Sequence, residues 1–203
     1  SNSNNVLTDF IATGKYDRNR PFYNTVSPSM DILISSNLER LLYLLSGGDD
    51  KLVTGYMKEL SDTGCYQVSE EMRKKIQSVF VGGFSSEAET EATIGKMMDE
   101  HKYLIDTHTA VAFHVLEQYR KETGDQTKTV VASTASPFKF CDAVLDALNV
   151  TDKATGTALL DQLAEVSGMP APQPLATLKD KQVRFTSWTE KEQMRAVVTD
   201  FLK

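Results

Sequence analysis

Hydrophobic residues recur along this chain in two patterns: stretches with the spacing of one helix face, and short runs of consecutive apolar or β-branched residues. The first pattern, read with its capping residues, predicts helices near residues 38–45, 52–60, 86–98, 107–123, 137–148, 158–167 and 189–201. Ser86 and Glu89 form a capping box, and Gly124 ends the helix that begins at Asp106 or Thr107. The chain should therefore contain several amphipathic helices.

The short apolar runs predict strands over residues 30–35, 78–81 and 129–132, and Thr129–Ala132 is the clearest of them. A strand, a short polar loop and a capped helix follow one another at least twice, which is typical of an α/β fold. We therefore expect a partial, mostly parallel sheet flanked by helices. Such a sheet exposes a strand edge and an apolar patch, which favours self-association.

The pattern changes at about residue 150, and Gly168–Pro174 interrupts it with three prolines. A last helix is expected from Thr189, capped with Glu192. The predicted domain organisation is thus an α/β part over residues 1–150 and a mainly helical C-terminal extension over residues 151–203.

The composition mainly argues against disorder and against nucleic-acid or membrane partners. Hydrophobic residues make up 40% and charged residues 25% of the 203 residues, which argues against disorder. The net charge is −6 and the basic residues are scattered, so we expect no nucleic-acid partner. No apolar run approaches the ~20 residues of a membrane span, and no signal-peptide pattern is present, so we expect a cytoplasmic protein without a membrane partner.

The first residues suggest a chain cut from a longer protein. Residue 1 is not Met, and a structured segment is already under way at Val6. Ser1-Asn2 matches the remnant of a removed tag, so our fold prediction leaves these two residues out.

Candidate chemistry is found in three places. The histidines at 101, 108 and 114 are spaced by seven and six residues, which does not place two ligands on adjacent turns of one helix face, so we predict no metal site. Gly82–Ser86 joins a predicted strand to a helix and is either a tight turn with an N-cap or an anion site. Ser133–Pro137 carries three hydroxyls after the clearest strand, where α/β sheets bind ligands, although such a loop can also simply cap a helix.

Five motifs stand in one order along residues 5–140. They are NVLTDFIATGKY (Asn5–Tyr16), SPSMDILISSNLER (Ser27–Arg40), ETEATI (Glu89–Ile94), DTHTAVA (Asp106–Ala112) and STASPFKF (Ser133–Phe140). Together they resemble the corresponding motifs of the threonine synthase family, a group of fold type II enzymes that use pyridoxal phosphate. The departures are Asn5, where many members have Asp, and Thr107, where Pro is usual.

The resemblance implies what the complete protein would do. Threonine synthases convert O-phosphohomoserine and water to threonine and phosphate, and a lysine in the N-terminal half holds the cofactor. Neither that lysine nor the glycine-rich phosphate cradle is recognisable here, so this chain alone should neither bind pyridoxal phosphate nor act on substrate. Its partner would be the missing N-terminal half.

The resemblance also implies roles for particular residues. Thr134 corresponds to the hydroxyl that bonds the pyridine nitrogen of the cofactor. Ser27, Ser29 and Asn37 are candidates for binding the phosphate or the amino-acid end of the substrate, although Ser and Asn also cap helices. For Asp106 and His108 we expect hydrogen bonds that brace a loop rather than proton transfer.

Two other functions stay open at this point. The complete protein could be a related phospholyase that acts on another phosphorylated amino acid. Alternatively, the chain could be an α/β binding module without catalysis, which a missing lysine permits.

Overall fold

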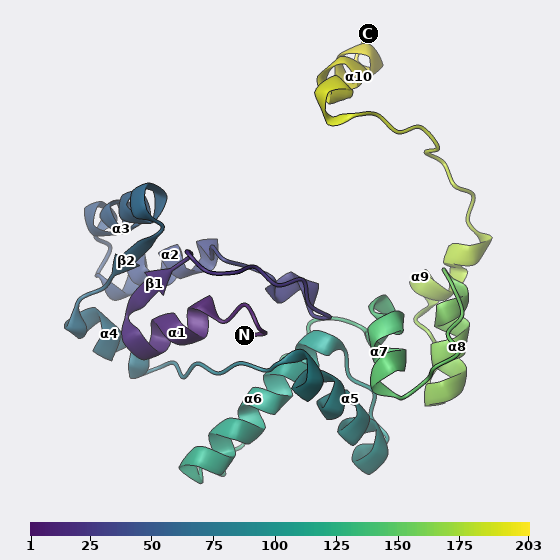
Figure 1. Cartoon of the computed structure of the whole chain (residues 1–203), viewed down its shortest axis with the longest axis horizontal. Helices are drawn as coiled ribbons and strands as arrows, with labels where there is room; N and C mark the ends of the chain where they lie inside the picture. The colour runs from purple at the N-terminus through teal and green to yellow at the C-terminus, as the bar shows by residue number, and fades with distance from the viewer.

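The computed structural model describes all 203 residues and is dominated by helices (Figure 1). Its elements are α1 (Val6–Thr13), β1 (Lys15–Asp17), η1 (Pro28–Met30), α2 (Ser36–Leu45), α3 (Asp50–Thr63), β2 (Cys65–Gln67), α4 (Glu70–Gln77), α5 (Glu87–His101), α6 (Thr107–Thr123), η2 (Pro137–Lys139), α7 (Cys141–Ala147), α8 (Ala158–Ser167), α9 (Gln173–Ala176), η3 (Thr177–Asp180), η4 (Lys191–Gln193) and α10 (Met194–Phe201). None of these helices combines the length and the hydropathy that a membrane crossing needs.

The first packing unit contains α1 to α4 and the only sheet, in which β1 and β2 pair antiparallel. Tyr16 lies opposite Tyr66, and both side chains are buried while their strand neighbours face outward. Their rings stack with centroids 5.3 Å apart, and Phe10 of α1 meets both edge-on. Leu42 and Ile76 complete this core from α2 and α4. Aromatic packing therefore holds a sheet that is too short to be stable by its ladder alone.

The second packing unit is built from α5, α6, α7 and α8 around a separate hydrophobic cluster. Ile94 of α5 and Val144 of α7 are fully buried in it, and α8 adds Leu160 and Leu163. Residues beyond 150 thus share this core with α5 and α7. The division of the chain at residue 150 stays a prediction.

Local signals begin and end the helices of this unit as the sequence predicts. The capping box of Ser86 and Glu89 is present at the start of α5. Asp106 caps α6, and Gly124 ends it in the left-handed conformation, with φ 74°. The predicted span of α8 is confirmed.

The two units are tied together by hydrogen bonds around the segment that precedes α5. The Thr8 hydroxyl donates to the Gly83 carbonyl at 2.7 Å, and the Val26 amide donates to the Glu87 carboxylate at 2.8 Å. A Cβ on Gly83 would lie 2.6 Å from Cγ1 of Val115, so only glycine allows this close approach. The Gly82-Gly83 pair therefore serves packing between the units, followed by the N-cap of α5.

The predicted partial, mostly parallel sheet is wrong: the sheet is two-stranded and antiparallel, and it uses none of the predicted strands. Residues 78–81 and 129–132 run without a strand partner, and Val130 is 95% exposed. The segment 30–35 begins at the last residue of η1 and continues as an irregular loop. A strand exists only where a neighbour accepts its backbone hydrogen bonds, and an apolar run carries no information about that neighbour.

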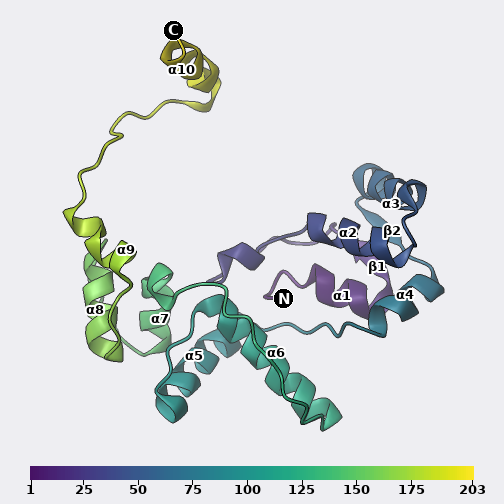
Figure 2. The same cartoon turned by 180° about the vertical axis from the view of Figure 1, so that it is seen from behind.

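The C-terminal segment leaves the second unit and ends in α10, which stands apart from the rest of the molecule (Figures 1 and 2). The last helix begins at Met194, after the 3-10 turn η4, and not at Thr189 as predicted. We call residues 181–203 the C-terminal arm. Its large apolar side chains are exposed, among them Phe185, Trp188, Val198, Phe201 and Leu202.

Asn2 belongs to the fold, although the sequence prediction left it out. Its side chain is completely buried and its amide donates to the Asp31 carboxylate at 2.7 Å and to the Ser27 hydroxyl at 3.0 Å. A short polar residue near a chain end carries no signal of burial. Only the residues that surround it reveal this role.

Replacing Asn2 should therefore weaken the fold more than replacing its neighbour Ser3. Asn2→Ala leaves buried acceptors without a donor, so we expect the free energy of unfolding to fall by about 1–3 kcal/mol. Ser3→Ala, at a half-buried position, should change it by less than about 0.5 kcal/mol. Urea unfolding of both variants measures the difference, and equal midpoints would contradict the assignment.

Candidate functional site

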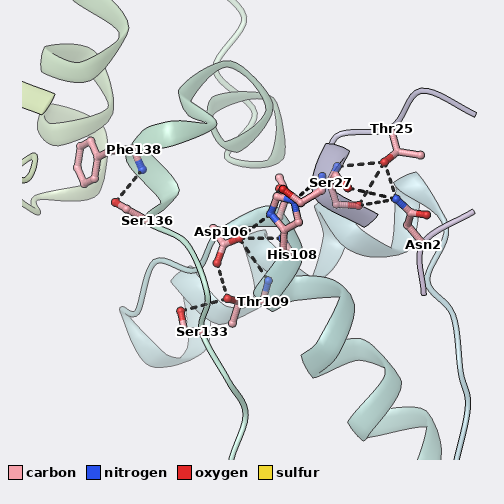
Figure 3. A network of polar contacts seen from close by, with 11 residues as sticks. Asn2, Thr25, Ser27, Asp106, His108, Thr109, Ser133, Ser136 and Phe138 are labelled. Carbon is pink, nitrogen blue, oxygen red and sulfur yellow. Dashed lines mark hydrogen bonds and ion pairs between the residues drawn. The ribbon is translucent and has the colours of Figure 1, made fainter. Parts of the chain in front are cut away.

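Two loops meet the first turn of α6, and this meeting point contains most of the residues singled out in the sequence (Figure 3). One loop is Thr25–Met30, which includes η1, and the other is Ser133–Ser136, which leads into η2. The turn of α6 lies between them with Asp106 at its N-cap. The buried start of α6 is therefore the support of the candidate site.

Asp106 is fully buried and accepts hydrogen bonds at both carboxylate oxygens. Its Oδ1 accepts from the His108 amide at 2.9 Å and lies 3.0 Å from His108 Nδ1. Its Oδ2 accepts from the Thr109 hydroxyl. The amides of a helix N-terminus stabilise a negative charge, so an ionised carboxylate suits this position.

His108 has hydrogen-bond partners at both ring nitrogens. The Ser29 amide donates to Nε2 at 3.1 Å, so this nitrogen carries a lone pair and the proton is on Nδ1, facing Asp106. The ring is buried and lies against Phe140, with centroids 4.8 Å apart. Both ring nitrogens thus have partners, and their contacts brace the Thr25–Met30 loop against the start of α6.

The loop that carries Thr134 is fixed at both ends. The hydroxyl oxygens of Thr109 and Ser133 lie 3.1 Å apart in a hydrogen bond, and Ser136 Oγ accepts from the Phe138 amide at 3.3 Å as the cap of η2. Thr134 itself is exposed. Thr134 is thus an exposed residue on a loop that contacts α6 at Ser133 and caps η2 at Ser136.

The Thr25–Met30 loop is held by buried amides and by Asp31. Thr25 bonds Asp31 twice, through its amide at 3.0 Å and its hydroxyl at 2.6 Å. Asn2 joins the same carboxylate to the Ser27 hydroxyl, and Asn4 donates to Asp31 at 3.0 Å. Asn2, Asn4 and Asp31 are structural residues that the sequence analysis missed, since two asparagines near one another and an aspartate almost thirty residues later show no periodic pattern.

The predicted substrate residues occupy different surroundings. Ser27 is completely buried with its hydroxyl bonded to Asn2, whereas Ser29 is exposed next to it. Asn37 is exposed on α2, in the first packing unit, where its amide oxygen accepts from Arg40. The structure therefore brings Ser29 to the α6 turn and leaves Asn37 on another element.

The lysines of the chain lie at its surface, and Lys153 is the only one that is half-buried. Hydrogen bonds to Asp142 and Asp146 raise the pKa of Lys153, and a hydrogen bond to Glu117 raises that of Lys96. A nucleophilic lysine needs the opposite shift, toward the neutral amine.

The histidines have separate partners rather than a common one. His108 is held as described, His114 contacts Gln118 and Glu89, and His101 lies 3.9 Å from Glu100. A groove of about 790 Å³ opens near η2, and most of its lining residues are apolar, among them Val26, Pro28, Phe138, Leu160 and Leu175. Thr134 does not line it, and we place the candidate chemistry at the polar loops instead, because an apolar groove offers few groups to a phosphorylated ligand.

Comparison with known proteins gives these loops a context. The family model described as "Threonine synthase, C-terminal" matches residues 109–198. Threonine synthase from Saccharomyces cerevisiae is 36% identical over 163 residues, which cover 73% of this chain and 32% of the yeast protein. Human threonine synthase-like 1 is 38% identical over 172 residues, covering 84% of this chain and 23% of the human protein.

Solved structures agree over nearly the whole chain. The crystal structure of PLP-bound threonine synthase from Brucella melitensis matches 100% of this chain and 38% of its own, with a TM-score of 0.80 and 32% identity. This chain resembles the C-terminal portion of threonine synthases. The yeast threonine synthase structure gives a TM-score of 0.81 over 99% of this chain and 41% of its own. The chain thus spans less than half the length of the threonine synthases that it matches.

Proposed function

We propose that this chain is the C-terminal portion of a threonine synthase and forms one wall of its pyridoxal phosphate site. The complete protein would convert O-phosphohomoserine and water to threonine and phosphate. The observation that carries this proposal is the position of Thr134, exposed on a loop with both ends fixed, within a motif that resembles the family's. A domain division at residue 150, with a catalytic part before it and a helical extension after it, belongs to the same proposal.

The residues of this chain fit one edge of the cofactor. Thr134 offers a neutral hydroxyl, which can bond a pyridine nitrogen without forcing it to stay protonated as an aspartate would. When bound, pyridoxal phosphate withdraws electrons from substrate carbons, which is the chemistry that elimination of phosphate needs. Thr134 would hold the ring nitrogen and set the orientation of the ring.

The surface positions of the lysines support the proposal that the nucleophile lies outside this chain. An exposed lysine at neutral pH is almost entirely protonated, because its pKa is about 10.4. Lys153 is further engaged by two carboxylates. The chain alone is therefore proposed to be inactive and unable to hold the cofactor stably.

Substrate binding is proposed for Ser27, Ser29 and Asn37. Hydroxyl and amide groups donate to phosphate and carboxylate oxygens, and Ser29 and Asn37 are exposed for this purpose. Ser27 would act through its buried hydroxyl by fixing the loop that presents Ser29.

The decisive test is the activity of the complete protein. Incubation with O-phosphohomoserine should release phosphate and form threonine in equal amounts, measured by a phosphate assay and amino-acid analysis. Release of phosphate without threonine would contradict the assignment.

A second candidate is a phospholyase that acts on another phosphorylated amino acid. It is favoured by the 38% identity to proteins named threonine synthase-like 1 rather than threonine synthase. Parallel assays with O-phosphoserine and O-phosphothreonine separate the two functions, since the product of each reaction differs.

The C-terminal arm is proposed to bind the missing N-terminal portion, and the same exposed apolar surface would cause self-association of this chain alone. Large apolar groups in solvent mark an interaction surface. A cytoplasmic location, with no nucleic-acid or membrane partner, completes the proposal.

Binding of the N-terminal portion should depend on the arm and not on exposed leucines elsewhere. Leu202 and Leu44 are 77% and 73% exposed, so Leu202→Asp and Leu44→Asp are matched changes on different surfaces. Burial of a leucine contributes about 1.5–3 kcal/mol, so Leu202→Asp should weaken binding by roughly tenfold or more. Titration calorimetry with the N-terminal portion measures both variants, and equal Kd values would exclude the arm.

A further inference from the structure

We infer that Asp106 is a positioning residue that fixes the Thr25–Met30 loop and the Ser133–Ser136 loop relative to one another. Each carboxylate oxygen of Asp106 is connected to one of the two loops. Oδ1 faces the His108 ring, whose far nitrogen accepts from the Ser29 amide, and Oδ2 accepts from Thr109, whose hydroxyl bonds Ser133 (Figure 3). One side chain thus stands between a candidate substrate loop and a candidate cofactor loop.

Burial makes this connection stiff. Asp106 is 0%, His108 4% and Thr109 5% exposed, so water has little access to the hydrogen bonds among these three residues. The backbone amides of His108 and Thr109 also donate to Oδ1, at 2.9 and 3.4 Å, which fixes the carboxylate itself. The first turn of α6 and the Asp106 side chain therefore form one rigid body.

The hydrogen bonds set the protonation of His108 as well. Because Nε2 accepts from a backbone amide, the ring is neutral and its proton faces Asp106. A ring with this fixed tautomer keeps its proton on Nδ1 and fixes the position of Ser29 relative to Asp106. His108 is accordingly a spacer between Asp106 and Ser29, and not an acid or base.

The consequence for the site is a fixed separation of its two sides. Ser29 is held through its own amide, and Thr134 directly follows the residue that Thr109 holds. If the proposed function is right, the distance between the cofactor ring nitrogen and the substrate's polar end depends on Asp106. Small errors in such a distance lower reaction rates strongly.

The first experiment follows amide hydrogen exchange at Ser29 and nitrogen-relaxation order parameters of residues 133–136 in this 203-residue chain, with no cofactor or substrate. Thr109→Val should lower the backbone order parameters of residues 133–136, whose amides donate no hydrogen bond, and leave exchange of the Ser29 amide unchanged. His108→Phe should raise exchange of the Ser29 amide roughly three- to tenfold and leave residues 133–136 unchanged, since a single lost hydrogen bond is weak. Asp106→Asn, which presents an amide group to a donor, should loosen both loops.

Thr93→Val is the matched control. Thr93 is 4% exposed, and its hydroxyl donates at 2.7 Å to a carbonyl of its own helix, so the change removes a buried hydroxyl away from both loops. Exchange of the Ser29 amide and the order parameters of residues 133–136 should stay at their wild-type values. Nitrogen NMR of His108 should show a protonated Nδ1 and an unprotonated Nε2.

The second experiment uses the complete protein. His108→Phe should raise KM for the phosphorylated substrate several-fold, Thr109→Val should weaken pyridoxal phosphate binding several-fold, and Asp106→Asn should do both. His108→Gln, whose side-chain carbonyl can accept from the Ser29 amide, should recover most of the KM.

The results separate this inference from the proposed function. If the wild-type protein makes no threonine, the proposed function fails while the exchange pattern still decides the coupling. The inference is overturned if Asp106→Asn loosens only one loop, if Thr93→Val loosens the loops equally, or if His108→Gln behaves as His108→Phe. Should Asp106→Asn fail to fold, Thr109→Val and His108→Phe still give the opposite patterns that the inference requires.

Discussion

Mixed with pyridoxal phosphate, this chain alone is expected to give no stoichiometric adduct that borohydride traps on a lysine, and no threonine from O-phosphohomoserine. Attack on the cofactor's aldehyde needs a neutral amine. Carboxylates raise the pKa of Lys15, Lys96, Lys153 and Lys179, so these amines stay protonated far above neutral pH. Absorbance of the mixture and mass spectrometry after reduction measure the adduct.

Addition of the N-terminal portion is expected to reverse this result. The complex should bind one cofactor per pair of chains and form threonine, while each portion alone stays at the uncatalysed rate. Enzymes exceed that rate by about a millionfold or more, so the contrast is close to all or none. A single lysine of this chain trapped in stoichiometric yield, with turnover, would show that the nucleophile lies in this portion.

Local sequence signals predicted the helices of the second packing unit well, because a helix satisfies its own backbone, but α1 and α4 of the first unit were not predicted. The capping box at Ser86, the N-cap at Asp106 and the glycine end at Gly124 each involve residues within one turn. The start of the last helix was predicted wrongly at Thr189. The 3-10 turn η4 lies only a few residues further along the chain, and the local signals of a cap do not distinguish such a turn from the first turn of an α-helix.

Strands were predicted wrongly because their formation depends on distant partners. Val130 belongs to a β-branched run, and yet its side chain is 95% exposed on an unpaired segment. The strands that do form, β1 and β2, are three residues long, and Tyr16 meets Tyr66 across fifty residues of sequence. Neither run is long enough to show a period of two.

The site shows the same limit. Asp106 and His108 were expected to brace a loop, and the composition of Ser133–Ser136 marked it as a ligand loop or a cap. What the sequence could not show is that Thr109 joins Asp106 to Ser133, or that Ser29 closes on His108 from seventy-nine residues away. For Thr109, the one signal in the sequence was its hydroxyl, about one turn after the predicted N-cap residue Asp106.

Thr134→Val in the complete protein is expected to lower turnover roughly ten- to hundredfold. The change nearly preserves volume and removes one hydroxyl, which we propose bonds the pyridine nitrogen. Loss of a partner for a buried acceptor costs about 1–3 kcal/mol, and the loss should fall on the transition states in which negative charge develops on substrate carbon. Steady-state kinetics of the variant measures this effect.

Two further variants make the result specific to Thr134. Thr134→Ser keeps a hydroxyl and should retain most activity. Thr129→Val removes an exposed hydroxyl that bonds the Thr127 carbonyl on the same segment, and should leave turnover unchanged. Because Thr134 is exposed in this chain, none of the three changes should shift the thermal melt of the chain appreciably. Full activity of Thr134→Val, or a loss that follows its melt, would reduce Thr134 to a loop residue before the cap of η2, and the orientation of the ring would have to come from another part of the protein.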